Sequence, residues 1–232
     1  MKKSIVIFTC SRHRAMALAA AENLVRLGVL VTICTDYLDA FDRTGFPEGV
    51  RYTATIWPRN GNLNGKEAVV GILRELQSAA AYHGAVWVGK CDSDTLVSAA
   101  MLERLETAPD ALGFASASRN WYGAAYFIRA ATLADLVTHA DALPEVPADS
   151  EEKYPEDVTV GKLLRAAGLN YEARPLGVHN NITDTPPAPG FLAVCYGFMA
   201  SMPPPFLSPE SRIAECARSM AVALNPVESV AA

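Results

Sequence analysis

Short apolar runs alternate with helical patterns along most of the chain, and few folds accommodate this alternation. Ser4–Thr9 is a continuous β-rich run, and Arg14–Leu27 has the pattern of a helix that ends at Gly28. Val29–Thr35 is again strand-like, so these segments predict a β-α-β unit with a right-handed crossover. The start of the chain therefore predicts a parallel sheet with helices packed on it.

The alternation continues beyond this unit. A helix is predicted at Gly65–Tyr82, and Ala85–Cys91 follows as a strand that is hydrophobic on both sides, as central parallel strands are. Later patterns predict helices at 99–105, 131–139 and 155–167, and strands at 111–116, 123–128 and 170–174. We therefore predict an α/β fold, Rossmann-like, with a mostly parallel central sheet flanked by helices.

The composition changes after about residue 185. The strings TPPAP and MPPPF flank an apolar stretch, and Ser208-Pro209 predicts the start of a helix that runs to about Leu224. We expect one domain over residues 1–185 and a proline-rich C-terminal extension over 186–232, with one helix at about 208–224.

The overall composition excludes several classes of protein. The chain has 232 residues, of which 50% are hydrophobic, so a large core is possible and disorder is disfavoured. The net charge of −5 and the absence of basic blocks argue against nucleic-acid binding. No apolar run approaches the roughly 20 residues of a membrane span. Five cysteines without a CxxC motif fit a reduced compartment, so a cytoplasmic location is expected.

Two aspartates follow the predicted central strand in AVWVGKCDSDTLV, which covers Ala85–Val97. If the strand continues through them, Asp92 and Asp94 point to the same side, about 6–7 Å apart. Such a pair favours a bound cation, and carboxylate oxygens suit Mg²⁺ or Mn²⁺. In open α/β sheets, ligands bind beyond the carboxyl ends of strands. A solvated turn is the alternative interpretation.

Other acidic and imidazole side chains lie near predicted element ends. Glu156 and Asp157 occupy the first turn of a predicted helix, where acids are also favoured by the helix dipole alone. His179 follows the last predicted strand and is a candidate third metal ligand, although a single histidine is often only a surface residue. A phosphatase of the haloacid-dehalogenase type is another interpretation of the two aspartates. Its motif would need Thr or Val where Leu96 stands and would lie on the first strand, so this interpretation is not favoured.

The order of these motifs resembles GT-A-fold glycosyltransferases, specifically the Fringe-like and β-galactosyltransferase-like group. The resemblance covers roughly residues 4–180. It is carried by KCDSDTLV at Lys90–Val97, YGAAYFIRAATLADLV at Tyr122–Val137, PEDVTVGKLL at Pro155–Leu164, the following His179, and ICTD at Ile33–Asp36. The chain departs from the group at Ser93, where an acidic residue is often found, and in lacking an evident cysteine framework.

The resemblance implies a metal-dependent glycosyltransferase of the hexosyltransferase type. The donor would be a UDP-sugar, and the transfer to an acceptor hydroxyl would invert the anomeric configuration. Asp94 would be the principal ligand of a Mn²⁺ or Mg²⁺ ion and His179 another, with Asp92 contacting the ion through water or binding the donor ribose. Asp157 would be the catalytic base, with Glu156 as second choice. The acceptor remains open between a glycan, a protein and a small molecule.

The resemblance also implies which residues border the donor. The turn after the first strand contributes Thr9, Ser11, Arg12 and Arg14. Asp36 would contact the uridine or ribose. The end of the central strand contributes Lys90, Asp92 and Ser93. The arginines could equally lie in solvent. Lys90 could pair with the aspartates or with the diphosphate, or its stem could lie across a sheet edge.

Two other functions stay open at this point. A catalytically silent GT-A-like module could bind nucleotide sugars without turnover. A sugar-phosphate nucleotidyltransferase is less favoured, because FTCSRHRAMA lacks the glycine-rich signature expected after the first strand.

Overall fold

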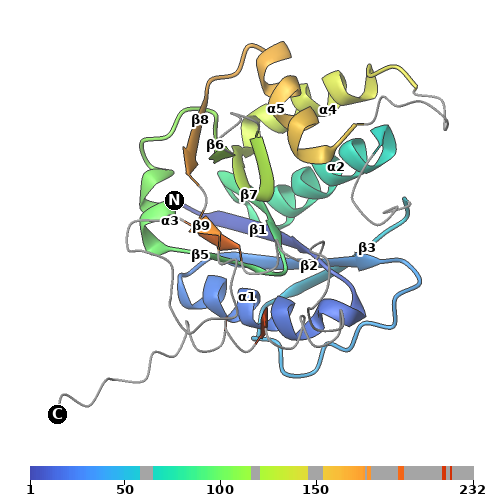
Figure 1. The fold of residues 1–232 in the computed structure, drawn as a ribbon, viewed down its shortest axis with the longest axis vertical. Coiled ribbons are helices and arrows are strands. Elements are labelled where there is room, and N and C mark those ends of the chain that lie inside the picture. The colour runs from blue at the N-terminus through green and yellow to red at the C-terminus, as the bar shows by residue number, and fades with distance from the viewer. Residues whose placement is uncertain are drawn as a thin grey trace, which may run out of the picture.

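The structure is a computed structural model that describes residues 1–57, 65–115, 121–145, 154–175, 177–178, 193–195, 216–217 and 220. Its main sheet has seven strands in the order β3-β2-β1-β4-β7-β6-β8 (Figure 1). The strands are β1 (Lys3–Phe8), β2 (Leu30–Asp36), β3 (Arg51–Thr55), β4 (Trp87–Asp92), β6 (Ala111–Ala115), β7 (Trp121–Arg129) and β8 (Tyr171–Pro175). All neighbours pair in parallel except β4 with β7 and β7 with β6. The predicted α/β class and mostly parallel sheet are confirmed.

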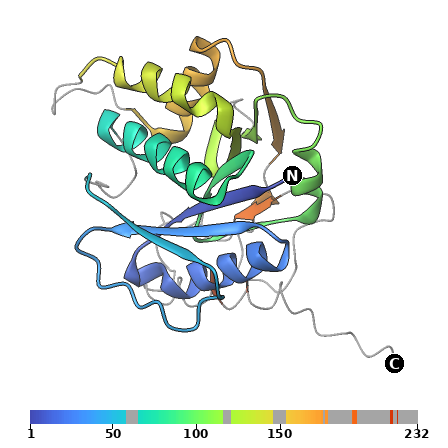
Figure 2. The same cartoon turned by 180° about the vertical axis from the view of Figure 1, so that it is seen from behind.

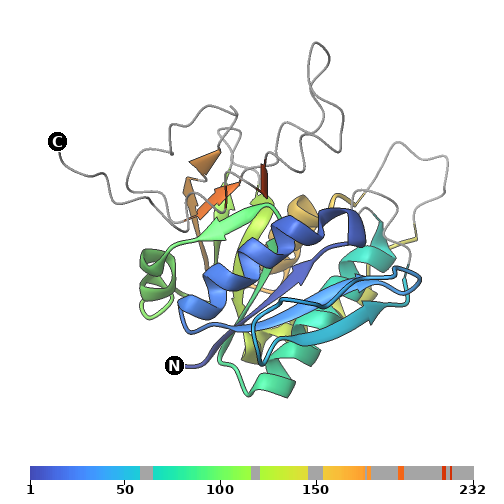
Figure 3. The ribbon, with the colours of Figure 1, turned by 90° about the horizontal axis from the view of Figure 1, so that it is seen from below.

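Helices cover both faces of this sheet. One face carries α1 (Arg14–Arg26), and the other carries α2 (Lys66–His83), α4 (Leu133–Asp141) and α5 (Glu156–Ala166), as the two opposite views show (Figures 1 and 2). Seen from below, α1 lies in front of the strands (Figure 3). The short helix α3 (Ala99–Arg104) follows a small strand, and two 3-10 turns, η1 (Ser11–His13) and η2 (Ala130–Thr132), precede α1 and α4.

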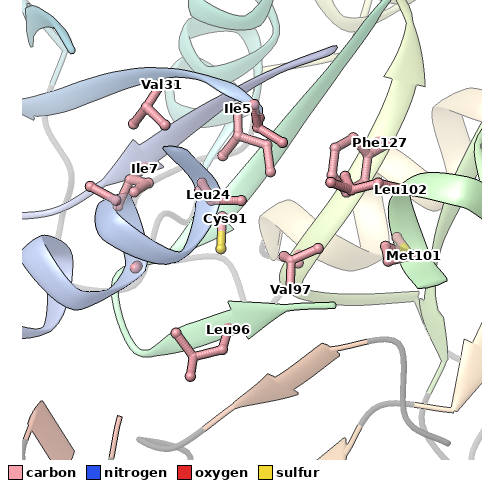
Figure 4. Packing of buried hydrophobic residues seen from close by; sticks show 14 of the residues in the cluster. Ile5, Ile7, Leu24, Val31, Cys91, Leu96, Val97, Met101, Leu102 and Phe127 are labelled. Atoms are coloured by element: carbon pink, nitrogen blue, oxygen red, sulfur yellow. The ribbon is translucent and has the colours of Figure 1, made fainter. Parts of the chain in front are cut away.

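The strand β4 shows why a core forms on both faces. Its residues alternate, so that Trp87 and Cys91 join the apolar cluster under α1 while Val88 joins the cluster under α2 and α5. The first cluster also contains Ile5, Ile7 and Phe127 (Figure 4). Burial of apolar side chains on both faces accounts for the doubly hydrophobic sequence of this strand.

The edge strand β3 was missing from the sequence-based prediction. Arg51–Thr55 reads RYTAT, and most of its side chains are half-buried or exposed. An edge strand covered on one side only lacks the continuous apolar run that marked β1, β2 and β4. Its backbone pairs in parallel with β2, with Asp36 opposite Thr55.

A second, three-stranded sheet follows the end of β4. It contains β5 (Thr95–Val97), β10 (Ala193–Cys195) and β9 (Gly177–Val178), in that order. Thus one strand of the expected C-terminal extension pairs with the segment that follows the two aspartates. Cys216 and Met220 from the expected helix at 208–224 are helical and buried in the cluster under α1, whereas most of that helix lies outside the described residues.

Two further properties concern the cysteines and the helices. In the described part of the chain, Cys10, Cys34, Cys91 and Cys216 form no disulfide. None of the described helices has the length and apolarity needed to cross a membrane.

Candidate functional site at the strand ends

The carboxyl ends of β1, β2 and β4 bring three predicted site residues to one edge of the sheet. Phe8 at the end of β1 is in register with Cys34 of β2 and with Asp92 of β4. The next residue, Thr9, is buried, and its N–H donates to the Cys34 carbonyl at 3.0 Å. Asp36 ends β2 at the same edge. Parallel pairing is the reason for this convergence, since parallel strands end at a common edge.

The two aspartates do not share one strand. β4 ends at Asp92, the chain turns at Ser93 and Asp94, and β5 starts at Thr95. The expectation that both carboxylates project from one face of a continuous strand is therefore wrong. The strand does not continue through Asp94 because β5 leaves the main sheet and pairs with β10. Ser93 is buried, and Asp94 is half-buried with Oδ1 accepting from the Thr95 hydroxyl at 3.4 Å.

Lys90 provides the positive charge next to Asp92. It lies two residues before Asp92 on β4, so both side chains leave the same face of the sheet. Its Nζ is 2.7 Å from Asp92 Oδ1 and 3.2 Å from Glu156 Oε2. The Lys90 side chain is only 2% exposed, whereas that of Asp92 is 39% exposed. The ammonium thus joins a carboxylate of the interior to one at the rim.

Glu156 is held from a second direction. Its Oε1 accepts a hydrogen bond from the Tyr126 hydroxyl at 2.5 Å, and both residues are buried. Tyr126 lies on β7 directly opposite Lys90, so the sheet register aligns the two donors toward the first residue of α5. We call Tyr126, Glu156, Lys90 and Asp92 the buried charge network. It connects β7, α5 and β4.

Burial and charge shift the pKa values inside this network. Burial alone would lower the pKa of Lys90, but the charges of Asp92 and Glu156 outweigh it and raise that pKa. Burial raises the pKa of Glu156, against the opposing effects of Lys90 and the Tyr126 hydroxyl. Burial, followed by the charge of Glu156, raises the pKa of Tyr126 well above its ordinary value. Lys90 therefore stays an ammonium ion at neutral pH.

The neighbouring acid, Asp157, has a different environment. It is half-buried in the first turn of α5, and its Oδ1 accepts from the N–H of Val158 at 2.7 Å. Pro155 is the N-cap of α5 and supplies no side-chain cap. The two candidate bases are therefore adjacent in sequence but differ in access, because Glu156 is buried and engaged at both oxygens.

The turn after β1 is fixed by a loop that the sequence analysis did not include. The N–H of Ser11 donates to Asp39 Oδ2 at 2.5 Å. Arg14 Nε lies 3.2 Å from Asp42 Oδ2, and its guanidinium also donates to the Thr44 carbonyl. Arg14 thus ties the loop after β2 to the start of α1. Of the two predicted arginines, Arg12 is the exposed one.

Cys10 is the N-cap of the 3-10 turn η1, and His13 is the last residue of that turn. The N–H of His13 donates to the Cys10 carbonyl at 2.9 Å. A hydrogen bond from His13 lowers the pKa of the Cys10 thiol, and the same contact raises the pKa of His13, with a smaller contribution from Asp94. The start of α1 and the Asp94 turn therefore interact electrostatically across the strand ends.

Two of the three predicted metal ligands, Asp92 and Asp94, lie among the described residues. Carboxylate oxygens from Asp92 and Asp94 suit hard cations. Among the described residues, however, no group of three or more His, Cys, Asp and Glu side chains could hold a metal ion. The third predicted ligand, His179, lies outside the described residues. The chemistry of the two carboxylates fits Mn²⁺ or Mg²⁺.

Comparison with known proteins identifies the fold. No protein family and no curated protein matches the sequence. Among solved structures, a glycosyltransferase involved in glycosylation of the major capsid of PBCV-1 is similar, with a TM-score of 0.58, 13% identity, and coverage of 96% of this chain and 100% of that chain. The galactosyltransferase LgtC, solved with donor and acceptor sugar analogues, has a TM-score of 0.53 and 13% identity over 93% of this chain and 95% of its own.

A third similar structure is a protein of Desulfovibrio desulfuricans G20 assigned as a nucleotide-diphospho-sugar transferase. Its TM-score is 0.50 at 15% identity, over 75% of this chain and 80% of that chain. At these identities the likeness establishes architecture. The chain has a GT-A-like α/β fold, and nucleotide-sugar glycosyltransferases are among the proteins that share it.

Proposed function

We propose that the protein is a metal-dependent glycosyltransferase of the hexosyltransferase type. It transfers a sugar from a UDP-sugar to an acceptor hydroxyl with inversion, as in the Fringe-like and β-galactosyltransferase-like group. One observation carries the proposal. Two motifs meet at a single ammonium, since Lys90 contacts Asp92 of its own motif and Glu156, which lies 66 residues later in the other motif. The GT-A-like fold supports it.

The donor binds at the carboxyl ends of β1, β2 and β4. The nucleoside lies against the turn after β1, where Thr9 and Ser11 carry hydroxyl groups and Asp36 ends the neighbouring strand. Arg12 is exposed and reaches the diphosphate, whereas Arg14 acts indirectly by fixing the loop that holds this turn. Ser93 supports the donor from the turn after β4.

Asp94 and His179 would hold the metal ion directly, and Asp92 would contact it through water or bind the donor ribose. When bound, a divalent cation neutralises the negative charge that develops on the diphosphate as the glycosidic bond breaks. Mixed carboxylate and imidazole ligation favours Mn²⁺ over Mg²⁺.

Asp157 is the catalytic base of the proposed reaction. It takes the proton of the acceptor hydroxyl at a carboxylate oxygen, while Glu156 is a weaker candidate because its oxygens are engaged by Lys90 and Tyr126. The half-buried position of Asp157 at the start of α5 leaves it the more accessible of the two acids.

Calorimetric titration with UDP, with and without Mn²⁺, tests the proposal. We expect UDP to bind the wild-type protein only with Mn²⁺, and to lose binding in Asp94→Ala. The matched control is Asp141→Ala, which removes an exposed surface carboxylate paired with Arg74 and should bind UDP normally. Absence of UDP binding under every condition would refute the proposed donor.

Donor hydrolysis then separates an enzyme from a silent binding module. A panel of nucleotide sugars is incubated with Mn²⁺ and the wild-type protein, and released UDP is measured. We expect hydrolysis with at least one donor and a loss of about 10²-fold or more in Asp157→Asn. UDP binding without turnover of any donor or acceptor would instead favour the silent module, and full activity in Asp157→Asn would show that the base is another residue.

A further inference from the structure

The geometry around Asp92 bears on how a cation reaches the site. A metal ion at Asp92 has to share this carboxylate with an ammonium that already lies 2.7 Å from Oδ1. Because Lys90 and the ion are both positive, each weakens the other's interaction with Asp92. The outcome depends on whether Lys90 can move away.

Lys90 has little freedom to do so. Its side chain is 2% exposed, and its neighbours across the sheet are Val6 of β1 and Tyr126 of β7. On the interior side, Glu156 Oε2 lies 3.2 Å from the Lys90 ammonium. Glu156 is itself fixed by a hydrogen bond from the Tyr126 hydroxyl. Turning the ammonium far from Asp92 would also take it away from Glu156 and bury it without a carboxylate partner, which is strongly unfavourable.

We infer that Lys90 is an internal counter-ion that competes with a divalent cation for Asp92. In this arrangement the protein alone binds a metal weakly, mainly through Asp94, and the oxygens of the donor diphosphate complete the coordination. Asp92 is kept as an oriented hydrogen-bond acceptor for the donor. The role given to the donor rests on the proposed function, whereas the competition at Asp92 does not.

The experiment measures binding of Mn²⁺ alone, with free Mn²⁺ followed by its electron paramagnetic resonance signal. The test variant is Lys90→Met combined with Glu156→Gln. It removes one positive and one negative charge together, so the net charge around Asp92 stays unchanged and no buried carboxylate loses its partner. The amide that replaces the Glu156 carboxylate can still accept a hydrogen bond from Tyr126. The control is Glu156→Gln alone, which keeps Lys90 beside Asp92.

We expect Mn²⁺ to bind the double variant about tenfold more tightly than wild type, because Asp92 is released as a ligand. The control should bind Mn²⁺ no more tightly than wild type, since its ammonium remains and one nearby negative charge is lost. Binding by the double variant when wild type shows none would support the inference equally. If the folded double variant binds Mn²⁺ no more tightly than wild type, Lys90 does not compete for Asp92.

Two measurements keep the result unambiguous. Circular dichroism and thermal melting establish that the double variant is folded, and Lys90→Gln with Glu156→Gln replaces it if it is not, because the amide retains a hydrogen-bond donor. UDP titration of the wild-type protein runs in parallel. If wild type binds UDP and the Mn²⁺ affinities do not differ, the inference fails while the glycosyltransferase proposal stands. If UDP does not bind but the affinities differ, the reverse holds.

Discussion

The two faces of the central sheet use the same strands for different purposes. Under α1, β4 contributes Trp87 and Cys91 to a cluster of buried hydrophobic residues. Under α5, the same strand contributes Val88 and then Lys90, which joins Glu156 in an ion pair inside an otherwise apolar layer. In the described part of the chain, these two are the only charged side chains that are buried.

This difference separates stability from function. Apolar packing under α1 needs only complementary volume, and small changes there are felt through cavities or overlap. A buried ion pair seldom adds stability over apolar residues of similar size, so its presence favours a role in holding Asp92 and the first turn of α5 in place. The two faces should therefore respond differently to substitution.

The largest effect is expected on the charged face, from Lys90→Met alone. This change leaves Glu156 buried without its ammonium, and we expect a loss of about 3–5 kcal/mol in the free energy of unfolding. Urea denaturation measures it. Adding Glu156→Gln should restore much of the loss, because the carboxylate is gone. Lys66→Met, which breaks a surface pair with Glu145, is the control and should cost at most about 1 kcal/mol. A minor loss in Lys90→Met would show that the pair is not energetically coupled.

On the apolar face, Gly89→Ala should lower the free energy of unfolding for a different reason, which is steric overlap. A Cβ at position 89 would lie 2.8 Å from the Tyr126 carbonyl oxygen and 2.9 Å from the Phe127 ring. Because one of these atoms belongs to the backbone of a neighbouring strand, relief requires the sheet to shift, and we expect a loss of roughly 1–3 kcal/mol. Urea denaturation checks this value. An increase in stability, as reduced chain entropy alone would give, would mean that the space around Gly89 is larger than the structure indicates.

The same contrast explains what could be predicted from sequence. The strands β1, β2 and β4 were predictable because burial on both faces leaves continuous apolar runs. Their parallel pairing then places Thr9, Asp36 and Asp92 at one edge, as expected for this architecture. The edge strand β3 was not predictable from a run such as RYTAT.

The partners inside the candidate site were harder to predict. The end of β4 at Asp92 depends on β5 pairing with β10, about a hundred residues later in the chain. Glu156 is 66 residues from Lys90, and Tyr126 is 30 from Glu156, so local patterns cannot bring them together. One signal was available: a lysine within the apolar run AVWVGKC is buried in a central strand, and a buried lysine requires an acid. His179 stays a prediction, as do the roles of the other site residues.

A smaller effect is expected when the network loses a hydrogen bond and no charge. Tyr126→Phe removes the hydroxyl that donates to Glu156 Oε1 at 2.5 Å, in a fully buried position. One buried carboxylate oxygen loses its donor, so we expect a loss of about 1–2 kcal/mol, measured by urea denaturation. Tyr82→Phe is the matched control, because Tyr82 is 68% exposed and its ring contacts with Arg51 and His83 do not involve the hydroxyl. Equal effects in the two variants would indicate that Glu156 does not depend on Tyr126.

The smallest effect concerns pH and again separates the two faces. The pKa values of Lys90 and Tyr126 are both raised in the folded state, so their contributions are complete below the unfolded values of about 10 and are lost as the pH rises through the folded values. Above about pH 10 the unfolded chain binds fewer protons than the folded protein does. Each of the two groups therefore lowers the unfolding free energy by up to about 1.4 kcal/mol per pH unit. Between pH 10 and 11, where Lys90 titrates only partly in the unfolded chain, its share is about 1 kcal/mol.

Urea denaturation across this range should therefore show a steeper decline in wild type than in Lys90→Met with Glu156→Gln, which keeps Tyr126 but has lost the lysine. Gly89→Ala crowds the Tyr126 carbonyl and the Phe127 ring but removes no titrating group, so its stability should decline in parallel with wild type. If the double variant also follows the wild-type slope, the ammonium of Lys90 is not more stable in the folded protein than in the unfolded chain, and the two faces differ in packing alone.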